Sequence, residues 1–274
     1  MDPDKDGEIN WDQVNFLIGI DTHGKIEGNH LLPYDTNTIV DRGIEFLITI
    51  ADLENSKLQV NESYNTRKDI PLYGYVFQEY NFPFRSKGTY DGQYSDLVFE
   101  TNKLRIRRDN EVVSRELFNQ SPLRFGSLDK QNPDYNSLAD FYADIDSNTI
   151  EIRIPYFLLN ITDPSQALIL NSSDAEKFDA KRTEGFYFYA VSYKPDENGL
   201  QVFVPSFAES TEDNNKEEAV LISDALPVIS DESILTESDS VNAYSWAKWQ
   251  EPHYYFELKD SYYIVQEEFE DGKN

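Results

Sequence analysis

Apolar and polar residues alternate along several stretches of this chain, a pattern that predicts β-strands. These stretches are residues 14–20, 44–50, 104–108, 149–155 and 185–193. In the first two, every second side chain is apolar and is expected to share one face: Val14, Phe16, Ile18 and Ile20, and then Ile44, Phe46, Ile48 and Ile50. In the fourth, Ile150, Ile152 and Ile154 are expected to point inward. The last stretch is apolar on both faces and should be covered on both.

No helical period appears between these stretches, which are joined by segments rich in Gly, Pro, Asn and Asp. This favours a mainly β fold, an antiparallel β-sandwich with long loops, over alternating strand–helix units. A helical spacing of apolar residues predicts one C-terminal helix over 257–269, and a shorter helical turn is expected at 137–145. We expect residues 1–13 to be an acidic connector and 14–274 to be a single domain with a long insertion at about 61–140.

The charge balance narrows the set of partners. The chain of 274 residues holds 24 basic and 51 acidic residues, a net charge of −27. Such a field repels phosphate backbones and anionic lipids but attracts divalent cations, so we expect no nucleic-acid partner. No apolar run has the length needed for membrane insertion. Cysteine is absent, which excludes disulfides, thiolate metal ligands and a cysteine nucleophile.

Three strand sequences resemble one known family. Asp21 and Thr22 end the first strand, Gly43–Phe46 read Gly-Ile-Glu-Phe, and Ile154–Leu158 read Ile-Pro-Tyr-Phe-Leu, with Tyr156 where Trp is usual. This order resembles family-9-type carbohydrate-binding modules and the related DOMON-type domains, over roughly residues 14–204. The resemblance implies a jelly-roll or DOMON-like β-sandwich that binds carbohydrate. It also implies a further strand upstream of Met1, so we expect the chain to be part of a longer protein.

The first residues resemble half of a calcium-binding loop. Asp2, Asp4 and Asp6 alternate and are followed by Gly7 and Glu8, which matches the oxygen ligands and the sharp turn of such a loop. The twelfth position holds Gln13 in place of a bidentate glutamate, and a strand follows in place of a helix. A solvated acidic turn is therefore favoured over a site in which Asp2, Asp4, Asp6 and Glu8 bind a structural Ca²⁺.

Catalytic signatures are missing from the sequence, although one polar loop stands out. Asp21, Thr22, His23 and Glu27 surround a glycine-containing loop, which is either a ligand site or a turn in which Asp21 accepts hydrogen bonds from local amides; the turn is favoured. The three histidines have no metal-ligand spacing, and no G-x-S-x-G elbow occurs. We therefore expect a non-catalytic protein.

Aromatic side chains are the candidate contacts for carbohydrate, because sugar C–H faces stack on flat rings. Most of these rings lie in a polar segment expected to be an exposed loop or directly before it, and two tryptophans lie near the C-terminus: Tyr73, Tyr75, Phe82, Phe84, Tyr90, Tyr94, Trp246 and Trp249. For the two tryptophans the alternative is that they anchor the C-terminal segment to the sheet, and this is favoured.

Together these features predict an exported, extracellular module of bacterial type that binds polysaccharide or a cell-surface glycan, as an accessory to a larger carbohydrate-active or polysaccharide-export protein. The chain would then lack its signal peptide. The alternative is a structural or interaction domain that packs on other domains of the same longer chain. A glycoside hydrolase is the least favoured prediction, because with 51 acidic residues a carboxylate pair arises by chance.

Overall fold

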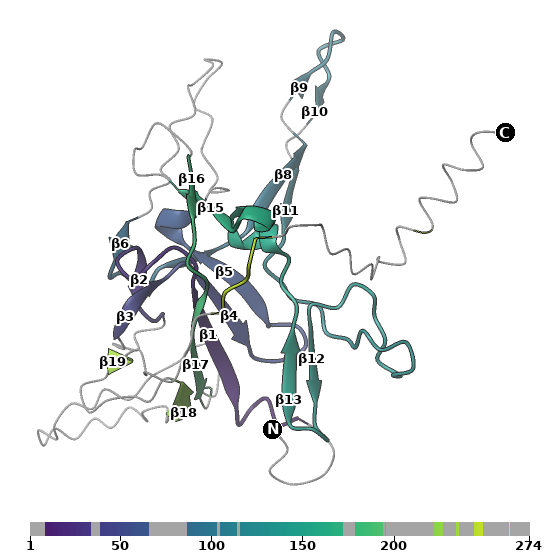
Figure 1. Cartoon of the computed structure of the whole chain (residues 1–274). Coiled ribbons are helices and arrows are strands. Elements are labelled where there is room, and N and C mark those ends of the chain that lie inside the picture. The colour runs from purple at the N-terminus through teal and green to yellow at the C-terminus, as the bar shows by residue number, and fades with distance from the viewer. Residues whose placement is uncertain are drawn as a thin grey trace, which may run out of the picture.

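A computed structural model describes residues 9–33, 39–65, 87–102, 105–113, 116–171, 179–193, 195, 222–226, 234–235, 244–248 and 263. Within these ranges the protein is mainly β, and most strand pairs are antiparallel, as the alternation predicts (Figure 1). Helical structure in the same ranges includes three 3₁₀ turns: η1 (Glu62–Tyr64), η2 (Tyr156–Leu159) and η3 (Pro164–Gln166). None of the helical residues described forms an apolar helix of membrane-spanning length.

The largest sheet has six strands, and every pair in it is antiparallel. Its order is β18 (Ile222–Leu226), β17 (Tyr187–Tyr193), β1 (Asn15–Asp21), β4 (Phe46–Ile50), β5 (Lys57–Asn61) and β7 (Tyr94–Asp96). Its inner strands include β1 and β17, which pair with each other along their whole lengths. The predicted insertion contributes β7, so part of it belongs to this sheet.

A second sheet has four strands, in the order β19 (Ile234–Leu235), β3 (Ile39–Ile44), β2 (Gly28–Leu31) and β6 (Gly88–Thr89). Its central pair is antiparallel, and both outer pairs are parallel. The remaining strands form smaller ladders: β8 (Val98–Asn102) with β11 (Glu116–Asn119), β9 (Arg105–Ile106) with β10 (Val112–Val113), β12 (Phe141–Asp144) with β13 (Thr149–Ile152), and β14 (Ile161–Asp163), β15 (Leu168–Asn171) and β16 (Asp179–Arg182).

Two apolar clusters lie on opposite faces of the six-stranded sheet. Alternate residues of β1, β4 and β17 enter different clusters: Phe16, Ile20, Phe46 and Phe188 belong to the first, whereas Leu17, Leu47, Tyr189 and Val191 belong to the second. Segments between residues 123 and 171 complete the first cluster, and β3 completes the second. The prediction that residues 185–193 are covered on both faces is therefore confirmed.

Two sequence predictions need correction. Residues 44–50 are not one strand with a single apolar face: β3 ends at Ile44 and β4 begins at Phe46, so Ile44 joins the second cluster while Phe46, Ile48 and Ile50 join the first. The helical turn expected at 137–145 is wrong for its second half, because Phe141–Asp144 form β12 and pair with β13. The predicted C-terminal helix lies outside the described residues, apart from Tyr263.

Candidate functional site

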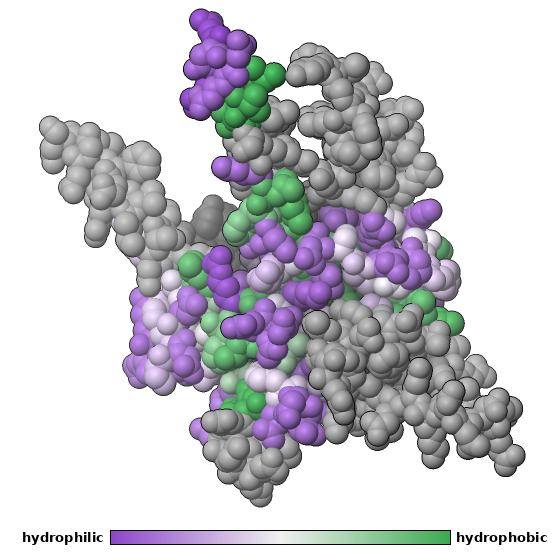
Figure 2. Space-filling view, turned by 180° about the vertical axis from the view of Figure 1, so that it is seen from behind, coloured by the Kyte–Doolittle hydropathy of each residue, from purple (hydrophilic) through white to green (hydrophobic). Residues whose placement is uncertain are grey.

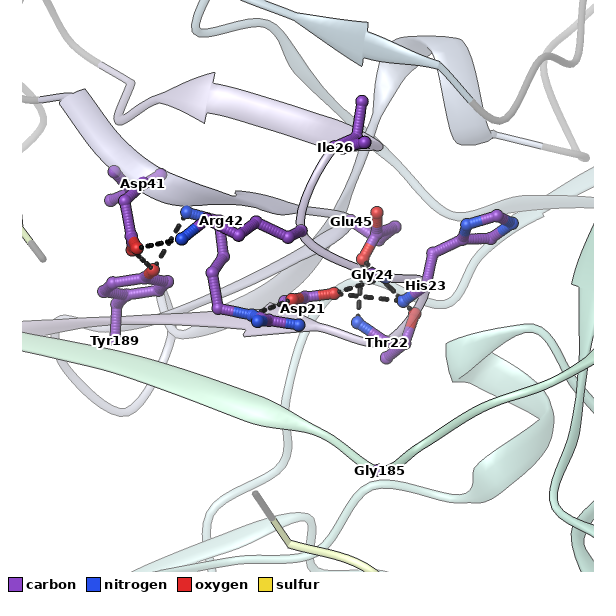
Figure 3. A network of polar contacts seen from close by, with 12 residues as sticks. Asp21, Thr22, His23, Gly24, Ile26, Asp41, Arg42, Glu45, Gly185 and Tyr189 are labelled. Carbon is purple, nitrogen blue, oxygen red and sulfur yellow. Dashed lines mark hydrogen bonds and ion pairs between the residues drawn. The ribbon is translucent and has the colours of Figure 1, made fainter. Parts of the chain in front are cut away.

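The loop after β1 is closed by the side chain of Asp21. Its Oδ1 accepts hydrogen bonds from the backbone N–H groups of His23 (3.1 Å) and Gly24 (2.9 Å). Its Oδ2 lies 2.6 Å from Nε of Arg42 (Figure 3). The guanidinium of Arg42 stacks on the ring of Tyr187, with its central carbon 3.5 Å from the ring centroid. Of the two interpretations of this loop, the structure shows the turn.

Glu45 lies between β3 and β4, where the chain passes from one sheet to the other. It is 0% exposed, and its Oε2 accepts hydrogen bonds from the backbone N–H groups of Thr22 (2.7 Å) and His23 (3.2 Å). Its Oε1 is one of four buried side-chain oxygens without a hydrogen-bond partner in the described part of the chain. Burial raises the pKa of Glu45 well above its usual value, and the neighbouring carboxylate of Asp21 raises it further.

His23 connects this loop to the three-stranded sheet. Its Nε2 lies 2.9 Å from Oδ1 of Asn171 on β15, and its Nδ1 lies 3.1 Å from Nζ of Lys181 on β16. Burial lowers the pKa of His23, and the charge of Lys181 lowers it further. These partners assign a neutral ring that donates from Nε2 and accepts at Nδ1.

The network around Asp21 and Glu45 therefore holds two loops and three sheets together. Arg42 also donates its backbone N–H to the hydroxyl of Tyr189 (3.0 Å), and that hydroxyl donates to Asp41 (Figure 3). The two central carboxyl groups are buried and engaged with neighbouring protein groups, so they are not accessible to a substrate. We assign the network a role in positioning the loops at this end of the molecule.

Tyr90, which the sequence predicted as a carbohydrate contact, lies at the surface close to this network. Its side chain is 67% exposed, and its ring stacks on His30 with centroids 4.8 Å apart and planes 17° from parallel. His30 is buried, and its two ring nitrogens lie 3.1 Å from the carbonyl oxygen of Val40 and 3.2 Å from that of Ile26. Tyr90 therefore rests on a fixed support, with most of its surface open to solvent.

The loop that carries Tyr90 is fastened to β2 by polar side chains. Asp91 Oδ1 accepts from Nδ2 of Asn29 (2.8 Å), and Asn29 Oδ1 accepts from the backbone N–H of Gly92 (3.2 Å). Gly92 has a φ of 62°, in the left-handed region that glycine adopts without strain. The side-chain amide of Gln93 also donates to the carbonyl oxygen of Asp91 (3.2 Å), so hydrogen bonds fix the loop directly after Tyr90.

The other predicted aromatic contacts have different positions. Tyr94 belongs to β7 and packs against the second apolar cluster, and its buried hydroxyl has no hydrogen-bond partner among the described residues. Trp246 packs on Tyr156 and Phe186 and donates from Nε1 to the carbonyl of Pro164 (2.7 Å). The structure thus shows the anchoring role for Trp246. Five candidates lie outside the described residues: Tyr73, Tyr75, Phe82, Phe84 and Trp249.

The predicted calcium ligands Asp2, Asp4, Asp6 and Glu8 also lie outside the described residues. Within the ranges that the structure describes, no three His, Asp or Glu side chains gather in a way that could hold a metal ion.

Comparison of the chain with protein-family models, with curated proteins and with solved structures finds no match.

Sequence reasoning missed three residues of these sites. Glu45 lies in the Gly-Ile-Glu-Phe motif of residues 43–46, but the sequence analysis assigned no function to its side chain. A single charged residue between Ile44 and Phe46, in an otherwise apolar stretch, is a signal of a buried carboxyl group. Arg42 and His30 carry no such local signal. Their roles depend on Asp21 and Tyr90, which are distant in the sequence.

Proposed function

We propose that this chain is a non-catalytic module that binds polysaccharide, and that Tyr90 is a principal contact. The fold we propose for it is a β-sandwich, in which the six-stranded and four-stranded sheets are the two layers around the second apolar cluster. The observation that carries the proposal is the exposed ring of Tyr90, stacked on the buried His30 and flanked by Asp91.

The geometry of Tyr90 suits a sugar ring. A pyranose stacks its C–H face on an aromatic ring while its hydroxyl groups bond to carboxylate and amide groups at the rim. Because His30 and the Asn29–Asp91 hydrogen bond already hold the loop, little conformational entropy is lost when a ligand binds. The same arrangement would be unusual for a purely structural tyrosine, which would bury more of its ring.

The charge of the chain bears on the type of glycan. A net charge of −27 repels polyanions over the whole surface. We therefore propose a neutral polysaccharide as the ligand. Ca²⁺, if it binds at the N-terminal aspartates, would have a structural role remote from Tyr90 in the sequence.

We expect replacement of Tyr90 by alanine to weaken polysaccharide binding about tenfold, because a stacked ring contributes roughly 1 kcal/mol or more. The measurement is native affinity electrophoresis through gels that contain neutral polysaccharides, with Ca²⁺ and with chelator. Tyr90→Phe is the matched control: it keeps the ring and should keep most of the retardation. Thermal unfolding of each variant checks that the fold is intact.

Each outcome has a definite meaning. Retardation of the wild type by one class of glycan, lost in Tyr90→Ala and kept in Tyr90→Phe, supports the proposal. Equal retardation of all three proteins places the binding surface elsewhere. Unchanged mobility of the wild type in every gel rejects the glycan-binding function and favours the interaction domain.

A further inference from the structure

Both ring nitrogens of the buried His30 face backbone carbonyl oxygens. Nδ1 lies 3.1 Å from the oxygen of Val40 on β3, and Nε2 lies 3.2 Å from the oxygen of Ile26 in the loop before β2. A carbonyl oxygen only accepts hydrogen bonds, whereas a neutral imidazole carries one N–H donor and one lone pair. The neutral ring therefore satisfies one of the two contacts and turns its lone pair toward the other oxygen.

The charged form of the His30 ring satisfies both contacts. An imidazolium has an N–H group on each nitrogen and donates to both oxygens, and a charged donor makes a stronger hydrogen bond than a neutral one. Tyr90 lies on the face of the same ring, with centroids 4.8 Å apart, which is the geometry of a cation–π contact. These three contacts oppose the cost of keeping a charge at a side chain that is only 6% exposed.

The loop of Tyr90 depends on few other contacts with the sheet. It follows β6, an outer strand of the four-stranded sheet that consists of Gly88–Thr89 alone and pairs with the first two residues of β2. Beyond this short ladder, the loop is joined to β2 by the stacking of Tyr90 on His30 and by the side chain of Asn29. A change in the His30 ring therefore acts on one of two side-chain fastenings.

We propose that His30 is a positioning residue whose proton holds the loop of Tyr90 in place for binding. Loss of the proton removes one hydrogen bond and the cation–π contact together, so the loop is held less firmly. Histidine is the side chain that changes charge between about pH 5 and 8, and the Tyr90 site is therefore best formed at the acidic end of this range. The effect on ligand binding rests on the proposed function, whereas the charge of His30 and its effect on the loop do not.

Other charged groups around His30 limit how its effect is measured. The described ionisable side chains on β3, on residues 24–27 and on residues 87–91, besides Tyr90, are those of Lys25, Glu27, Asp41, Arg42, Lys87 and Asp91. Carboxyl, amino and guanidinium groups ordinarily keep their charge between about pH 5.5 and 8, and Figure 2 shows hydrophilic residues over much of the described surface. Glu45 differs, because burial raises its pKa. The experiments must therefore separate His30 from Glu45.

NMR of the full chain with isotope-labelled histidine tests the charge of His30. The chain holds three histidines, and the signals that disappear in His30→Gln are those of His30. We expect two protonated ring nitrogens at about pH 5.5, with both N–H protons in slow exchange with water because carbonyl oxygens hold them, and one at about pH 8. His23, whose pKa is lowered by burial, should stay neutral to a lower pH. A neutral His30 at pH 5.5, or no slowly exchanging N–H proton, overturns the proposal.

Hydrogen exchange of the Gly92 amide tests the loop without a ligand. This N–H donates to the side chain of Asn29. After correction for the pH dependence of intrinsic exchange, its protection should fall about fivefold from pH 5.5 to 8, which corresponds to one lost hydrogen bond. Protection should stay constant in His30→Gln, because glutamine does not change its charge. An equal fall in His30→Gln would assign the effect to Glu45 and overturn the proposal.

The pH profile of polysaccharide binding extends the test to the proposed function. Retardation in native affinity gels, taken relative to gels without polysaccharide, should indicate binding about fivefold weaker at pH 8 than at pH 5.5. The profile should be flat in His30→Gln and kept in Glu45→Gln, which removes the other titrating group. A flat wild-type profile overturns the control by His30 and leaves glycan binding intact. Absence of retardation at both pH values rejects glycan binding, and the NMR and exchange results then decide the role of His30.

Discussion

Replacement of Gly43 by alanine should abolish folding. A Cβ atom at this position would lie 1.5 Å from the carbonyl oxygen of Glu27 and 2.5 Å from its carbonyl carbon. Both atoms belong to the main chain of the loop that leads into β2, so no side-chain rotation relieves the overlap. The loop and β3 would have to separate. We expect a loss of more than about 4 kcal/mol, which is a large part of the stability of an ordinary domain.

Gly19→Ala is the matched control for this prediction. Its added Cβ would also be close to neighbouring atoms, but all three of the nearest atoms belong to the side chain of Ile44, which can rotate. Overpacking of this kind costs about 1–3 kcal/mol. Urea denaturation followed by tryptophan fluorescence and circular dichroism measures both variants. A folded Gly43→Ala protein that loses no more stability than Gly19→Ala would show that the loop and β3 do not approach so closely.

Replacement of Glu45 by glutamine should stabilise the protein at neutral pH. The amide oxygen of glutamine can still accept the hydrogen bonds from Thr22 and His23, while the buried negative charge and its repulsion with Asp21 are removed. Burying a polar group without a partner costs about 1–3 kcal/mol, and more when the group is charged. We therefore expect a gain on the order of 1–3 kcal/mol at pH 7.

The pH dependence of this gain gives the sharper test. The pKa of Glu45 in the folded protein is raised well above its usual value of 4.5, so the folded state binds the proton more tightly than the unfolded state. The protonated carboxyl group therefore stabilises the fold below pH 4.5, and this stabilisation is lost as pH rises toward the folded-state pKa. The difference between Glu45→Gln and the wild type should be small near pH 4 and should grow toward pH 7.

Denaturant unfolding at a series of pH values measures this difference. The exposed Glu54→Gln variant removes one charge of the same kind without relieving a buried one, and should change the stability by less than about 0.5 kcal/mol at every pH. A gain for Glu45→Gln that is constant from pH 4 to pH 7 would show that Glu45 does not titrate differently in the folded and unfolded states.

Local sequence patterns were sufficient for the strands with two-residue periodicity. Phe16, Ile18 and Ile20 face one apolar cluster as predicted, and Ile150, Ile152 and Ile154 pack against the same cluster. The turn at Asp21 was also predictable, because an aspartate reaches the backbone amides two and three residues onward in any such loop. These features depend only on neighbours in the chain.

The passage from β3 to β4 was not predictable in this way. Ile44 and Phe46 continue the same alternation, and periodicity cannot indicate that the chain changes sheets at Glu45. The change depends on the fit of Gly43 against the loop at Glu27, a contact between main-chain segments with no signature in either sequence. The sequence favoured an anchoring role for Trp246, but its partners Pro164 and Phe186 are distant in the sequence and were identified only by the tertiary structure.

The sequence by itself determined the mainly β class, the faces of β1 and β17, and the choice of Tyr90 as a candidate contact. Only the tertiary structure decided that Tyr90 stacks on His30 while Tyr94 enters the second cluster, and that Glu45 is buried beside Asp21. The reason is physical: periodicity records which side of a strand is apolar, whereas burial and protonation depend on groups that approach from elsewhere in the chain.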